Sequence, residues 1–203
     1  MAVVLFFGAL FSFGSRYPGY SHSNRAVSEL GAFGAPHAWG WNIVGFIIPG
    51  ILLAMSGASI ALTVDGGRTR LLWLLLISGL AFAGTGVFPA EMHNSDPLMS
   101  SLWTSGHIVM LFISGVAWIA GSVVLVRHVG RSTQRRSLKQ FSLFLCVMAF
   151  AGMAINVTVT AIPALENSPG LAQRIAFALY FAWYLMAASS FVSAPTEPQY
   201  SSA

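Results

Sequence analysis

The sequence has few charged residues. Asp, Glu, Lys and Arg make up 8% of its 203 residues, whereas an ordinary soluble domain has about 25%, and 56% of the residues are apolar. This composition excludes a disordered chain, a nucleic-acid-binding domain and an ordinary soluble enzyme. The single cysteine, Cys146, excludes a disulfide framework within the chain and a zinc site made of cysteines alone. A polytopic membrane protein remains, with membrane lipids and no nucleic acid as its expected partners.

Six apolar runs reach or approach the length of a membrane span. A helix needs about 20 apolar residues to cross roughly 30 Å of hydrocarbon, and the runs cover residues 1–15, 41–63, 71–88, 106–126, 141–162 and 171–192. The predicted fold is an all-α integral membrane bundle of six transmembrane helices, with a short helix in the first outer loop. Residues 1–193 form its single domain, and residues 194–203, rich in Pro and Ser, form a disordered cytoplasmic tail. The first run is short, so we expect it to extend to Tyr20, to tilt little or to begin slightly inside the membrane.

The basic residues predict the orientation of the chain. The loops at residues 64–70 and 127–140 carry seven of the ten Lys and Arg residues, and both fall on one side of a six-span topology. Short loops rich in Lys and Arg stay in the cytoplasm. The expected location is therefore the plasma (inner) membrane, crossed several times, with both termini cytoplasmic.

Small residues and one proline predict how the spans pack. Gly79 and Ala83 lie four residues apart in the third run, as do Ala117 and Gly121 in the fourth, and this spacing lets two helix backbones approach closely. Pro49 lies inside the second run. Its ring and its missing amide hydrogen are expected to kink that helix and free carbonyl groups.

Polar residues gather on the predicted outer side. Four of the five histidines and four of the six acids map there together with three arginines: His22, His37, His93, His107, Glu29, Glu91, Asp96, Glu166, Arg16, Arg25 and Arg174. Asn156 lies in the outer half of the fifth run. Ionisable groups at membrane depth are costly and usually line a cavity. We therefore predict a polar pocket that opens to the outer face and is capped by the first loop, residues 16–40.

The first loop contains a pattern typical of a short capped helix. Ser21 is placed to cap it, and His22, Arg25 and Glu29 follow at spacings that put them on one helical face. Gly31 and Gly34 are expected to end this helix, and Pro36 breaks it. One interpretation is an interfacial helix with a weak Arg25–Glu29 ion pair. The other is a face that closes over the pocket, with Arg25 for an anionic head group and Glu29 or His22 for proton transfer.

The same loop carries a resemblance to a known family. Residues 21–32, Ser-His-Ser-Asn-Arg-Ala-Val-Ser-Glu-Leu-Gly-Ala, with Gly34-Ala35-Pro36 after them, resemble the signature of domain-of-unknown-function family 998, bacterial and archaeal polytopic membrane proteins. Residues 86–89, Gly-Val-Phe-Pro, and His107 at the start of the fourth run are also similar to the family pattern. The resemblance implies the fold and the importance of Ser28, Glu29 and His107. It implies no reaction.

Several kinds of chemistry fit the outer polar residues. Glu91, His93 and His107 could hold a divalent metal, with His22 or Glu29 as a fourth ligand, but their spacing matches no strong metal motif, so no cofactor is predicted. A serine nucleophile at Ser28 or Ser105 lacks a Gly-x-Ser-x-Gly elbow. A haem needs two facing histidines within the spans, and only His107 comes near. Acid–base chemistry without a metal remains.

The sequence-based hypothesis is a membrane-embedded enzyme that acts on a lipid or isoprenoid-like substrate through acid–base groups. The predicted catalytic residues are Glu29 and His107, completed by His22, Glu91 and His93. The predicted substrate-binding residues are Arg25, Ser28, Asn24, Asn156 and Arg174. The alternative is a non-catalytic protein that binds or transports a lipid or another lipophilic small molecule in the same pocket.

Overall fold

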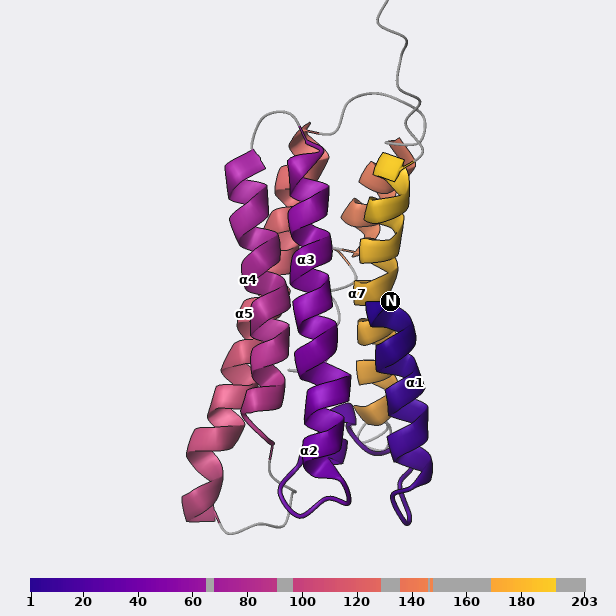
Figure 1. The fold of residues 1–203 in the computed structure, drawn as a ribbon, viewed down its shortest axis with the longest axis vertical. Helices are drawn as coiled ribbons and strands as arrows, with labels where there is room; N and C mark the ends of the chain where they lie inside the picture. The colour runs from indigo at the N-terminus through magenta and orange to yellow at the C-terminus, as the bar shows by residue number, and fades with distance from the viewer. Residues whose placement is uncertain (65–67, 91–96, 129–135, 146, 148–168, 193–203) are drawn as a thin grey trace, which may run out of the picture.

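The described part of the chain is built of helices. The computed structural model describes residues 1–64, 68–90, 97–128, 136–145, 147 and 169–192. Their regular elements are the α-helices α1 (Ala2–Ser15), α2 (Ala38–Trp41), α3 (Ile48–Leu62), α4 (Arg68–Val87), α5 (Pro97–His128) and α7 (Pro169–Val192), the 3-10 helix η1 (Val27–Gly31) and the π-helix η2 (Asn42–Ile47). Residues 136–145 are helical as well. No strand occurs among these residues, which confirms the predicted all-α class (Figure 1).

Three helices are long and apolar enough to cross a membrane, which indicates a membrane protein. They cover Ala38–Leu62, Arg68–Val87 and Leu102–His128. α1 is apolar but has 14 residues, so at about 1.5 Å per residue it is shorter than the hydrocarbon layer. It begins partway along the bundle, as Figure 1 shows. Most of the predicted fifth span (141–162) and the predicted tail (194–203) lie outside the described residues.

The predicted close packing of small residues is confirmed where α4 meets α3. A Cβ atom on Gly79 would overlap the backbone of Ala54, and one on Gly50 would overlap the backbone of Ala83. Gly121 of α5 packs against the side chain of Leu75, whose Cδ2 would lie 2.9 Å from an added Cβ. Between α3 and α4 the helix backbones approach one another because no side chain separates them at Gly50 and Gly79.

Pro49 is accommodated by a local change of helix type. The π-helix η2 ends at Ile47, two residues before it, and the amide of Ile48 donates to the carbonyl of Ile43, five residues back. A proline ring collides with the carbonyl four residues earlier in a regular α-helix. The wider π turn relieves that conflict, and α2, η2 and α3 continue as one apolar helix over Ala38–Leu62. The expected kink therefore takes the form of a π turn.

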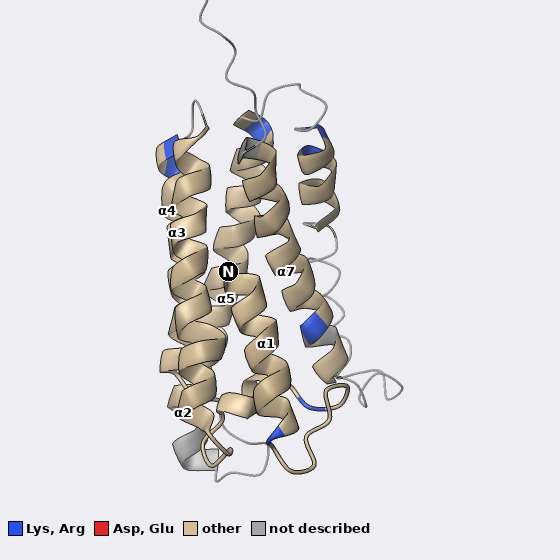
Figure 2. Ribbon diagram, turned by 45° about the vertical axis from the view of Figure 1, so that its right-hand side comes forward, with Lys and Arg blue, Asp and Glu red and all other residues tan. Residues whose placement is uncertain are grey.

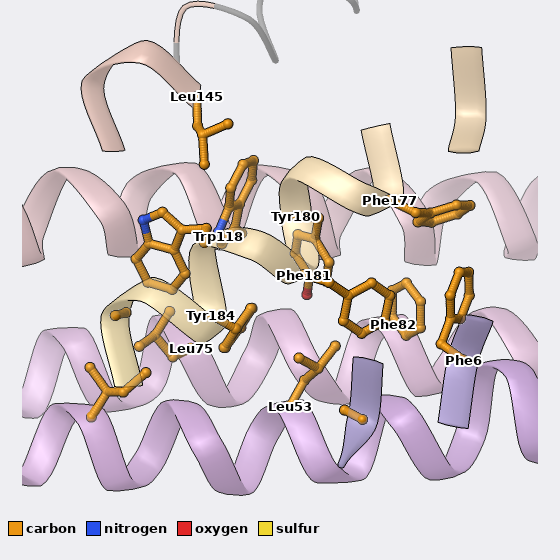
Figure 3. Close-up of a cluster of buried hydrophobic side chains, with 14 of the residues drawn as sticks. Phe6, Leu53, Leu75, Phe82, Trp118, Leu145, Phe177, Tyr180, Phe181 and Tyr184 are labelled. Carbon is orange, nitrogen blue, oxygen red and sulfur yellow. The ribbon is translucent and has the colours of Figure 1, made fainter. Parts of the chain in front are cut away.

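Buried aromatic and polar side chains hold α7 to the rest of the bundle. Phe181 packs against Phe6 of α1 and Phe82 of α4, with ring centroids 4.8 and 5.9 Å away (Figure 3). Deeper in the bundle, the Ser78 hydroxyl donates to the Ser114 carbonyl at 3.0 Å and lies 2.9 Å from the Tyr180 hydroxyl. Since the Ser78 proton is engaged, the Tyr180 hydroxyl donates to Ser78. These bonds join α4, α5 and α7.

The two ends of the bundle differ in composition. Lys and Arg colour both ends in Figure 2. The end where α4 begins and α5 finishes, called the basic end here, carries Arg68, Arg70 and Arg127. The opposite end, called the loop end, holds the connection from α1 to α2, residues 16–37, and the first turn of α7.

Candidate functional site

The first loop contains two short turns in place of the predicted single helix. The amide of Arg25 donates to the Ser21 carbonyl at 2.9 Å, which closes one turn, and Ser21 Oγ accepts from the Asn24 amide at 3.3 Å. Ala26 is then extended, with ψ 149°, and η1 begins at Val27. The prediction of one continuous helix was wrong because the Ala26 amide donates instead to Glu29 Oε1, at 2.8 Å. His22 therefore does not share a helical face with Glu29.

Glu29 has a structural role in this loop. One of its carboxylate oxygens receives the Ala26 amide at the start of η1, as an N-terminal helix cap does. The other lies 3.8 Å from Arg25 Nε, which confirms the predicted ion pair. With the two side chains 40% and 33% exposed, that pair contributes little to stability. Arg25 also lies over the Tyr17 ring, 5.1 Å from its centroid.

Arg174, the one basic residue of α7, fastens the loop to that helix. Its Nη1 donates to the carbonyls of Arg25 (3.0 Å) and Gly170 (2.7 Å). Its Nη2 donates to the Tyr20 hydroxyl at 2.7 Å and to His22 Nδ1 at 3.1 Å. Both terminal nitrogens of the guanidinium thus donate to acceptors within the protein. We call this set of four bonds the Arg174 latch.

Backbone contacts extend the latch. The Leu171 amide donates to the Ser23 carbonyl at 2.9 Å, and the Val27 amide donates to Gln173 Oε1 at 2.8 Å. A Cβ on Gly170 would overlap the Arg25 carbonyl oxygen. The loop main chain therefore rests directly on the first turn of α7. Of the other predicted binding residues, Asn24 is exposed and receives the Ser23 hydroxyl, and Ser28 is half-buried within η1.

The His22 contact makes the latch sensitive to pH. Burial, and to a smaller extent the neighbouring Arg174 guanidinium, lowers the pKa of His22 below its ordinary value of 6.5. Tyr20 and Phe11 pack against the same ring. The folded chain favours neutral His22, so this stabilisation is complete above pH 6.5 and is lost as the pH falls through the folded-state pKa.

We therefore expect the thermal midpoint to fall more for the wild type than for His22→Asn when the pH drops from about 8 to about 5. Asn keeps an oxygen where His22 has Nδ1, so it can still accept from Arg174 but does not titrate. The expected difference is about 1–2 °C, because a partly exposed group shifts stability little. Equal pH dependence in both proteins would show that His22 does not act through the latch.

His107 is not part of the Arg174 latch and lies instead against the end of α4. Its ring is buried, and its Nδ1 lies 2.9 Å from the carbonyls of both Thr85 and Phe88, at the end of α4. Carbonyl oxygens only accept, so Nδ1 carries the proton. The ring also meets Phe46 edge-on at 5.7 Å. The described contacts of His107 and those of Glu29 share no residue, so the two predicted catalytic groups belong to separate networks.

A set of substitutions distinguishes a capping role of His107 from a catalytic one. We expect His107→Ala to lower the free energy of unfolding by about 1–3 kcal/mol, because two carbonyls at the end of α4 lose their donor. His107→Asn should retain most of the stability, since its amide nitrogen occupies the place of Nδ1, whereas His107→Gln reaches past it. Reversible unfolding in detergent measures all three. Equal losses in the Asn and Ala variants would contradict the capping role.

A cavity of about 570 Å³ opens at the loop end, apart from both networks. It lies between the end of α1, the loop residues 31–37 and α2. Its walls include Phe13, Phe33 and Trp39, and Asn42 contributes a buried amide that donates to the Gly31 carbonyl at 2.9 Å. Arg16 and His37 are the ionisable residues among the described residues that line it. The predicted catalytic and substrate-binding residues that the structure describes do not line it.

Arg16 and His37 were counted among the outer polar residues but not selected from the sequence. They stand near the two ends of the first loop, a position that could have suggested a shared site. Both are exposed, and no partner is found for either side chain among the residues that the structure describes. His37 is also the one described non-glycine residue with a positive φ, at 59°.

Part of the sequence-based site lies outside the described residues. This holds for Glu91, His93 and Asn156. Within the described ranges, no three His, Cys, Asp or Glu side chains are grouped so that they could hold a metal ion. Since Glu91 and His93, two of the three suggested ligands, lie outside these ranges, the metal site stays a prediction.

Comparison with known proteins gives a family and no more. The model of one family, described as "Protein of unknown function (DUF998)", matches residues 1–190. No curated protein and no solved structure matches the chain.

Proposed function

Since the chain belongs to DUF998, a family of proteins of unknown function, we propose its function from its own geometry. It is a six-span protein of the plasma membrane, with both termini cytoplasmic, that binds a lipid or another lipophilic small molecule in the cavity at the loop end. The enrichment of Lys and Arg in two loops supports this orientation, with the loop end outside.

The cavity is the observation that carries this proposal. Its volume of about 570 Å³ falls within the range of about 300–1,000 Å³ that is usual for small-molecule sites. Phe33 and Trp39, which line it, are 44% and 61% exposed. Aromatic side chains of this kind are enriched where a membrane meets water. A lipophilic molecule could therefore enter from the bilayer with its polar end toward the outer water.

The geometry favours binding over the acid–base enzyme predicted from the sequence. No carboxylate is found among the described residues that line the cavity. Glu29 caps η1, and His107 Nδ1 donates to the end of α4. Arg25 and Arg174, predicted to bind substrate, are engaged with Glu29 and with the latch. Catalysis by Glu29 and His107 stays a prediction, and the experiment below also tests it.

The test is to fill the cavity. Ala38 lines it, whereas Ala178 is exposed on α7, so Ala38→Trp and Ala178→Trp form a matched pair. We expect native mass spectrometry of the detergent-purified protein to show one bound lipophilic species in the wild type and in Ala178→Trp. Ala38→Trp should lose it. Equal loading of all three, or no bound species in any, would contradict the proposal.

The same preparation separates binding from catalysis. The species extracted from the wild type is identified and then incubated again with the protein. Recovery of the unchanged compound supports a binding protein. Its conversion to a product, lost in Glu29→Gln with the fold retained, would favour the enzyme.

A further inference from the structure

We infer that the cavity at the loop end selects a lipid whose headgroup carries a net negative charge, with Arg16 and His37 as the residues that hold the headgroup. This inference rests on the proposed function and names the ligand class of the same site.

Among the arginines of the loop end, Arg16 is the one that meets no acid and no acceptor in the part of the chain that the structure describes. Arg25 faces Glu29, the one acid in the part of the chain that the structure describes. Arg174 donates four hydrogen bonds within the latch. Arg16 lines the cavity, is exposed and has no partner among the described residues. A cation at the mouth of an aromatic-walled cavity is complementary to an anion on an apolar tail.

His37 adds a second, independent observation. It lines the same cavity and adopts φ 59° and ψ 28°, the left-handed region. The other described residues with positive φ are Gly19 and Gly34, which have no Cβ to strain. A histidine in this conformation costs stability that a glycine or an asparagine would save. Strained backbone conformations cluster at functional sites, and here the imidazole can donate to the headgroup beside Arg16.

The apolar residues that line the cavity indicate that the ligand also has an apolar tail. Phe13, Phe33 and Trp39 line the cavity together with Arg16 and His37. A free phosphate or another small anion would leave these aromatic faces uncovered. A lipid satisfies both halves, because its acyl chain covers aromatic surface while its headgroup meets the cation near the membrane surface.

Native mass spectrometry with added lipid tests the charge preference. The delipidated protein in detergent is titrated with dioleoyl phosphatidylglycerol, which is anionic, or dioleoyl phosphatidylcholine, which is zwitterionic. We expect tighter binding of phosphatidylglycerol. Arg16→Gln should weaken it about fivefold, the effect of one basic residue near an anionic lipid surface. Arg70→Gln, which removes the same charge from an exposed position at the basic end, should leave it unchanged.

His37→Gly separates function from folding. Glycine adopts the left-handed conformation without a Cβ to strain, so the thermal midpoint should stay about equal or rise. Phosphatidylglycerol binding should nevertheless weaken by about tenfold, because glycine has no side-chain donor for the anionic headgroup. Unchanged binding in this variant would remove His37 from the site.

The outcomes distinguish the two levels of the proposal. If both lipids bound the wild type equally and neither bound the Ala38→Trp variant, the charge preference would be overturned and the proposed function would remain. Binding of neither lipid would overturn the inference, and it would overturn the proposed function as well if the purified wild type also carried no bound lipophilic species. Glycerol phosphate that binds as tightly as phosphatidylglycerol would show that the anion matters and the lipid tail does not, which also overturns the inference.

Discussion

Replacing Gly79 by alanine should destabilise the bundle by about 3 kcal/mol, near the upper end of the usual cost of overpacking. The added methyl group would overlap the backbone of Ala54, so it cannot be accommodated by rotating a side chain. α3 and α4 must move apart, and the neighbouring contact of Gly50 with Ala83 would loosen with them. Unfolding in a denaturing detergent, followed by circular dichroism, measures the loss.

Gly115 provides the matched control for this substitution. It lies within α5, and a Cβ placed there meets no atom of the described structure within 4 Å. Gly115→Ala should stabilise the protein by up to about 1 kcal/mol, because alanine favours the helix over glycine. Similar effects of the two substitutions would contradict the tight contact between α3 and α4.

Replacing Arg174 by methionine should release the first loop from α7. Methionine keeps much of the length of the side chain but removes the donors to Arg25, Gly170, Tyr20 and His22. We expect a loss of about 3 kcal/mol, since hydrogen bonds from a charged donor are worth about 1.5–3 kcal/mol each and this side chain is only partly buried. Hydrogen exchange at the amides of Val27 and Leu171 reports the release directly.

Gln173→Ala is the control on the same helix turn. It removes one hydrogen bond, from the Val27 amide, and should cost about 1 kcal/mol. If Arg174→Met cost no more than Gln173→Ala, Arg174 would not be the anchor of the loop. Its guanidinium would then be available to a ligand, as the sequence suggested.

The sequence by itself determined the features that depend on local pattern. The apolar runs predict a helical membrane protein because backbone polar groups in lipid must be satisfied within each segment. The four-residue spacing of Gly79 and Ala83 predicts a close helix contact because that spacing defines one helix face. The Arg25–Glu29 pair is likewise a short-range contact, and it is present at 3.8 Å. The family followed from motif strings that the chain carries in linear order.

Only the tertiary structure decided which partner each polar side chain has. His22 looked like a member of the Glu29 face, but it meets Arg174, 152 positions away. His107 looked like an acid–base group, and it binds the end of α4. A polar side chain can be satisfied by many donors or acceptors, and only the path of the whole chain decides which one comes within 3 Å. Arg16 and His37 likewise line the same cavity only because the loop between them folds back over the end of the bundle.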